Sequence, residues 1–92
     1  MSAAAPETLA LRALAWMAER PEVFGGFLGT SGLAPTDMRA VASEPGFLGS
    51  VLDYVLDEEG RARDCAEALD LPPEALIRAR AALPGGQDPH WT

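Results

Sequence analysis

The chain contains no lysine, and its seven basic residues are all arginine. Against these stand fourteen acidic residues, so the net charge is −7 and the isoelectric point lies near 4.4. A chain of this charge repels nucleic acid and anionic lipid surfaces unless its arginines gather on one face. The composition therefore argues against a nucleic-acid partner.

Cysteine and long apolar runs are also scarce. The single cysteine, Cys65, permits no internal disulfide. No apolar stretch approaches the roughly 20 residues that cross a bilayer. Residues 1–18 lack the basic start of a secretory signal, and Arg12 interrupts their apolar run. We therefore expect a cytoplasmic protein with no membrane partner.

Strand-like alternation of apolar and polar residues is missing as well, and the apolar spacing has the helical period. A length of 92 residues allows one small domain. The pattern predicts an all-α fold, a compact bundle of five or six short helices with the first helix, apolar nearly all round, as the central and most buried one. We expect a flexible N-terminus over residues 1–6, the helical domain over 7–84 and a polar tail over 85–92. Trp91 in that tail is either an anchor on the bundle or part of a disordered end.

Prolines and glycines mark where the helices begin and end. Proline suits the first position of a helix, where its missing amide hydrogen is not needed. Leu33 and Leu71 each precede such a start and can pack on the residue five positions later. The spacing predicts helices over residues 6–20, from 21 to a left-handed cap at Gly32, from 35, over 45–59, over 61–69, and from 73 to a stop at 84–86.

The segment Gly25-Gly-Phe-Leu-Gly-Thr-Ser-Gly32 has the composition of a phosphate-binding loop but not its pattern. A P-loop needs a preceding strand, a G-x-x-x-x-G spacing and a lysine, and a dinucleotide site needs G-x-G-x-x-G after a strand. Neither spacing fits, and a helix precedes the segment. We interpret it as a helix. Gly25 and Gly29 lie four residues apart on one stripe of this helix. We expect one of the two glycines to support close helix packing and the other to border a partner surface.

The remaining polar residues form no recognisable catalytic or metal site. Asp53, Asp57, Glu58 and Glu59 lack the alternate spacing of a calcium loop, so we interpret them as a solvated helix face and C-terminal turn. Cys65 has no neighbouring positive charge in the pattern of an activated thiolate, and the only histidine, His90, lies in the tail. We expect no catalytic residue, no cofactor and no metal.

Residues 61–83 carry an alternative, a DNA-binding helix-turn-helix. Ala66, Leu71, Leu76 and Ala79 fall where that motif places its packing residues. Its DNA contacts would come from Arg61, Arg63, Arg78 and Arg80. However, the second helix opens with two prolines and Glu74 in place of hydrogen-bond donors to bases, which favours helix packing without DNA.

Five short motifs in fixed order resemble domain-of-unknown-function family 3572, a group of small bacterial proteins. The resemblance spans about residues 9 to 85, and it implies no activity and no site residues. The motifs are Ala10-Leu-x-x-Leu-Ala-Trp16, Phe27-Leu28 with Ser31-Gly-Leu-x-Pro35, Pro45-x-Phe-Leu-x-x-Val-Leu-Asp53, Leu71-Pro-Pro-Glu74 and Ala79-Arg-Ala-Ala-Leu-Pro-Gly85.

By elimination, the sequence favours a small non-catalytic module that binds another protein. No nucleophile, base and oxyanion donors can be assembled from its polar residues. Among its residues, Gly25 and Gly29 are the candidates for the partner surface.

Overall fold

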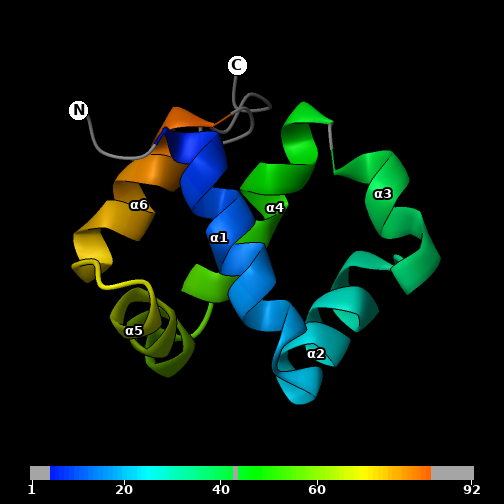
Figure 1. Cartoon of the computed structure of the whole chain (residues 1–92), viewed down its shortest axis with the longest axis horizontal. Coiled ribbons are helices and arrows are strands. Elements are labelled where there is room, and N and C mark those ends of the chain that lie inside the picture. The colour runs from blue at the N-terminus through cyan, green and yellow to red at the C-terminus, as the bar shows by residue number, and fades with distance from the viewer. Residues whose placement is uncertain (1–4, 43, 84–92) are drawn as a thin grey trace.

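The computed structural model describes residues 5–42 and 44–83. Over these ranges the chain forms six α-helices and one 3-10 turn, with no strand, so the all-α prediction is confirmed (Figure 1). The elements are α1 (Pro6–Ala18), α2 (Pro21–Ser31), η1 (Pro35–Asp37), α3 (Met38–Val41), α4 (Pro45–Leu56), α5 (Glu59–Ala68) and α6 (Pro73–Ala82).

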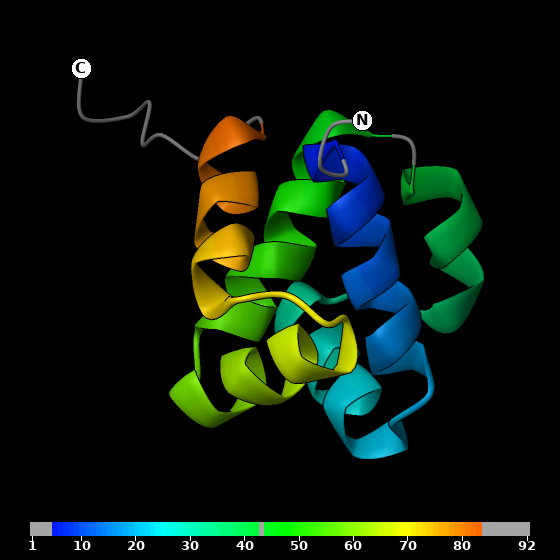
Figure 2. The same cartoon turned by 60° about the vertical axis from the view of Figure 1, so that its left-hand side comes forward.

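Helices α1 and α4 lie side by side in the middle of the molecule (Figures 1 and 2). Helix α1 packs on α2, α4, α5 and α6, so the first helix is surrounded by the others as expected. It is not the single most buried helix, however, because α4 packs on α1, α5 and α6 and buries most of its own apolar side chains. Two helices therefore share the centre.

The core lies where these helices meet. Its largest fully buried side chains are Phe27, Met17, Leu52, Leu76, Val51, Val55 and Cys65. The Phe27 ring packs edge-on against those of Phe47 and Tyr54, with centroids 6.0 and 5.6 Å apart. Burial of such side chains contributes about 1.5–3 kcal/mol each. Helix α2 is thus joined to α4 mainly through aromatic contacts.

Proline begins most of the helices, as the sequence predicts. Helices α1, α2, α4 and α6 all have proline in their first turn. At η1, the Asp37 side chain reaches back to residue 34, and its carboxylate accepts a 2.8 Å hydrogen bond from the Ala34 amide. Proline leaves no amide hydrogen to satisfy in the first turn, and the Asp37 carboxylate satisfies the Ala34 amide that no helical carbonyl can reach.

The predicted boundary between the fourth and fifth helices is wrong. Helix α4 ends at Leu56 and not at residue 59, and α5 begins at Glu59 and not at residue 61. The extended backbone of Glu58, with φ −131° and ψ 127°, separates the two helices. Glu58 and Glu59 therefore lie at a helix N-terminus, where the helix dipole favours a carboxylate, and not at the C-terminus expected from the sequence.

Two helices end in a left-handed residue. Gly32 closes α2 with φ 76° and donates its amide hydrogen to the Leu28 carbonyl, which confirms the predicted cap. Asp70 follows α5 with φ 61°, a left-handed conformation that no residue pattern in the sequence predicts. The predicted stop of the last helix at 84–86 and the tail with His90 and Trp91 lie outside the described residues.

Candidate functional site

Cys65 is fully buried in the core. Burial raises the pKa of its thiol from 9.0 to about 11, and the nearby Arg20 and Arg12 offset only part of this rise. The thiol is therefore protonated at neutral pH and lacks the accessible thiolate that a nucleophile requires. Cys65 therefore serves as a small buried side chain of the core.

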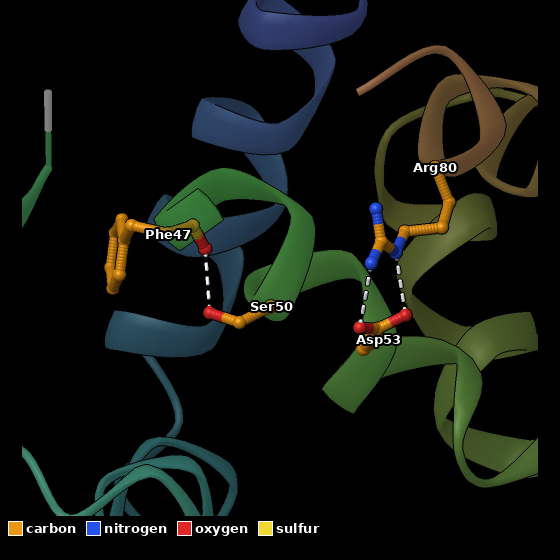
Figure 3. Close-up of polar contacts among 4 residues, drawn as sticks. All are labelled: Phe47, Ser50, Asp53 and Arg80. Atoms are coloured by element: carbon orange, nitrogen blue, oxygen red, sulfur yellow. Dashed lines mark hydrogen bonds and ion pairs between the residues drawn. The ribbon is translucent and has the colours of Figure 1, made fainter. Parts of the chain in front are cut away.

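The acidic residues of α4 and α5 are engaged separately and do not converge. Asp53 accepts two hydrogen bonds from Arg80, at 2.6 and 2.9 Å, as Figure 3 shows. Glu58 pairs with Arg61 at 2.9 Å. Over the ranges that the structure describes, no group of three or more His, Cys, Asp or Glu residues could hold a metal ion.

The four arginines of the helix-turn-helix alternative fall into two pairs. Arg80 is bound to Asp53, and its side chain is only 15% exposed. Arg61 donates to the Tyr54 carbonyl and to Glu58, and its guanidinium lies 3.9 Å from the centroid of the Tyr54 ring. Arg63 and Arg78, by contrast, are exposed. Arg61 and Arg80 are thus held closely within the fold, whereas Arg63 makes only a long ion pair of 3.9 Å with Glu59.

The glycines of α2 do not divide as the sequence analysis expected. A Cβ atom added at Gly25 or at Gly29 would meet nothing within 4 Å, so neither glycine supports close helix packing. The close approach occurs at Gly26, where an added Cβ would meet the Tyr54 hydroxyl and ring carbon. Gly25 and Gly29 remain together on an exposed stripe of α2.

An apolar groove of about 320 Å³ lies between α1, α2 and α3. Leu11, one of the residues that line the groove, is a large apolar side chain and is 46% exposed. Leu14, Phe24 and Met38 are half-buried. We call this surface the apolar groove. It is lined by Leu11, Leu14, Ala15, Ala18, Phe24 and Met38.

The sequence carries a signal for the apolar groove, although the apolar spacing of the first helix also predicts that this helix is the most buried one. Leu11, Leu14, Ala15 and Ala18 follow the spacing i, i+3, i+4, i+7, which marks one stripe of a helix. Helix α1 has a second apolar stripe, with Ala13 and Met17 at its centre, that faces the core. Because α1 is apolar on nearly every side, the sequence predicts that it is the most buried helix. In the structure, however, one of its apolar stripes faces solvent.

A second groove, of about 370 Å³, lies between α2 and α4 and has a mixed lining. It combines two aromatic rings, several hydroxyl groups and two carboxylates. We call this surface the polar groove. Its lining residues are Phe27, Thr30, Ser31, Ser50, Asp53, Tyr54 and Asp57.

The comparisons place the chain in a family without a described activity. The family described as "Protein of unknown function (DUF3572)" matches residues 3–86, nearly the whole chain. Searches among curated proteins and among solved structures gave no match. Within residues 5–42 and 44–83, no helix has the length and apolar character to cross a membrane.

Proposed function

The chain belongs to the DUF3572 family, and from its surface we propose that it is a small non-catalytic module that binds an amphipathic helix of another protein. The observation that carries the proposal is the apolar groove. We also propose that the protein acts in the cytoplasm, where such a partner would be met.

The lining of the apolar groove suits a protein segment better than a polar metabolite. Small-molecule sites are apolar too, but they hold a few convergent polar groups that orient the ligand. The residues that line this groove carry only aliphatic, aromatic and thioether side chains. Met38 can adapt to partners of different shape because its side chain is flexible and polarisable. An apolar surface of this kind is typical of an interaction site.

The dimensions of the groove favour a helix as the occupant. Leu11 and Ala18 are seven residues apart on α1, which corresponds to about 10 Å along the helix axis. Two turns of a partner helix cover the same length with side chains at i, i+3 or i+4, and i+7. The net charge of −7 favours a helix whose polar face is basic.

DNA binding through residues 61–83 remains the second candidate, because Arg63 and Arg78 are exposed on neighbouring helices. Arg61 and Arg80, however, are paired with carboxylates within the fold, and contacts to DNA phosphates would require both arginines to leave those carboxylates. This favours a protein partner over DNA. Binding to duplex DNA, with and without Arg63→Ala and Arg78→Ala, tests this candidate. Sub-micromolar affinity with sequence preference at physiological salt would favour it over the module.

The experiment for the apolar groove compares two exposed apolar residues. Partners captured from the source cells are identified, and the affinity of the isolated partner helix is measured by calorimetry. Leu11→Ser removes a groove side chain, whereas Ile77→Ser removes one that is 56% exposed on α6, outside the groove. We expect Leu11→Ser to weaken binding by about tenfold or more, in the range of an interface anchor, and Ile77→Ser to leave it unchanged.

Chemical denaturation of both variants controls for the fold. Each substitution removes a side chain that is roughly half exposed, so the free energy of unfolding should change little. Equal binding by the wild type and both variants would show that the apolar groove is not the docking surface.

A further inference from the structure

We propose that the polar groove is a second binding site, and that its ligand is a small organic cation carrying an alkylammonium group. This site is separate from the apolar groove, and the proposal does not depend on the protein-binding function. It rests on the hydrogen-bonding character of the groove lining and on the helix ends that meet there.

The groove lies where Tyr54 of α4 reaches the backbone of α2. No Cβ stands at Gly26, and the Tyr54 hydroxyl lies against the α2 backbone at that position. The Phe27 and Tyr54 rings are in edge contact and line the groove together. The rest of the lining comes from both helices. Thr30 and Ser31 belong to the last turn of α2, Ser50 and Asp53 belong to α4, and Asp57 caps the end of α4.

Two of the hydroxyl groups that line the groove, those of Ser31 and Ser50, already donate their protons within the fold. Ser50 donates to the Phe47 carbonyl at 2.6 Å (Figure 3), and Ser31 donates to the Leu28 carbonyl at 3.4 Å. A serine has one proton to donate, so both oxygens offer only lone pairs to a ligand. The carboxylates of Asp53 and Asp57 offer acceptor oxygens as well, and each Asp53 oxygen keeps a lone pair beyond its bond to Arg80. Most of the polar lining therefore accepts hydrogen bonds.

The electrostatic environment also favours a cation. The C-terminal ends of α2 and α4 both reach the groove, and a helix C-terminus carries partial negative charge. Neither helix has a basic residue in its last turn. Asp57 caps the end of α4, where the dipole disfavours a carboxylate unless a cation is near. Arg61 and Arg80 contact Tyr54 and Asp53, but neither is among the residues that line the groove.

An alkylammonium group fits this lining better than other cations. It has three donors and no acceptor, which matches the oxygens of Ser31, Ser50 and Asp57. Its alkyl stem can lie along the edges of the Phe27 and Tyr54 rings, as the stems of long basic side chains do on apolar surfaces. Among the described residues, no group of three or more His, Cys, Asp or Glu side chains could hold a metal ion, which favours an organic cation for this groove.

The test uses n-butylammonium as the probe and n-butanol as its uncharged isostere. Each is titrated into the isotopically labelled full chain, and amide chemical shifts are followed by NMR. We expect saturable shifts in the low millimolar range with n-butylammonium, centred on residues 27–31 and 50–57, and none with n-butanol at the same concentrations. Asp57→Asn should weaken binding by about fivefold, the scale of a solvent-accessible ion pair. Asp64→Asn, which changes an exposed carboxylate on α5 outside this groove, is the matched control and should bind as the wild type does.

Three results would overturn the proposal. Equal shifts with n-butanol would show that only the rings bind. Equal weakening by Asp57→Asn and Asp64→Asn would show that the probe responds to net charge and not to this groove. No saturation with n-butylammonium, together with binding of a lysine-containing peptide to the same residues, would assign the groove to a protein ligand.

Discussion

At the residue scale, the glycines of α2 serve different purposes, and alanine substitution separates them. Gly32 has φ 76°, which is unfavourable for a residue with a Cβ, so Gly32→Ala should destabilise the fold by about 1 kcal/mol. Gly25 and Gly29 have open space around them, so alanine at either should stabilise by up to about 1 kcal/mol through helix propensity. Chemical denaturation of the three variants checks both signs. A neutral or stabilising Gly32→Ala would contradict the cap.

Gly26 provides the complementary prediction. An added Cβ there meets the Tyr54 hydroxyl, and the Tyr54 ring is held between Phe27 and Arg61. Gly26→Ala should therefore destabilise by about 1–3 kcal/mol, as overpacking does in other cores. Tyr54→Phe removes the hydroxyl and should recover part of that loss in the double variant. If the two substitutions are additive, the contact does not explain the glycine.

At the scale of the element, the end of α5 holds the one described non-glycine residue with positive φ. Leu71 donates to the Ala66 carbonyl at 2.8 Å and Asp70 to the Glu67 carbonyl at 3.1 Å, which is the pattern of a Schellman motif. Asp70→Gly keeps these bonds, relieves the left-handed penalty and removes a carboxylate from a helix C-terminus. We expect it to raise the free energy of unfolding by up to about 1 kcal/mol, as measured in urea. A loss of stability would show that the Asp70 side chain makes a contact that outweighs its backbone strain.

Most of the helices could be predicted from the sequence because their ends depend on local chemistry. Proline at the first turn and Gly32 at a left-handed cap act through nearby backbone atoms, so the local sequence is enough to predict where these helices begin or end. The break at Glu58 could not be predicted in the same way. After this break, the Arg61 side chain donates a hydrogen bond to the Tyr54 carbonyl. This contact forms only once α4 and α5 have packed together.

The candidate surfaces were less accessible to sequence reasoning. The sequence shows the apolar stripe of Leu11, Leu14 and Ala18. Whether such a stripe faces the core or solvent, however, depends on how many other helices pack around its helix. The polar groove brings together Ser31 and Ser50, and no local pattern connects these positions. The partner surface expected at Gly25 and Gly29 stays a prediction, although the packing expected for one of them is wrong.

At the scale of the whole molecule, Cys65 links the pH to the stability of the fold. Because burial raises its pKa from 9.0 to about 11, the unfolded chain loses the thiol proton first as the pH rises. The stability that the protonated thiol contributes is therefore complete below pH 9 and is lost progressively between about pH 9 and 11. We expect the wild type to lose roughly 2 kcal/mol over this range beyond any loss in Cys65→Ala. Parallel pH profiles of the two proteins, measured by denaturation, would contradict the buried thiol.

The first turn of α1 and the last turn of α6 lie at the same end of the molecule, and the two helices pack on each other (Figures 1 and 2). A circular permutant, in which a glycine–serine linker joins residue 83 directly to residue 5, should therefore keep the fold, since such rearrangements succeed where the joined ends lie close together. New termini between Leu33 and Ala34 would interrupt only a short, largely exposed connection. A permutant with the helical circular dichroism spectrum and cooperative unfolding of the parent chain would show that the order in which the helices are synthesised does not determine their arrangement.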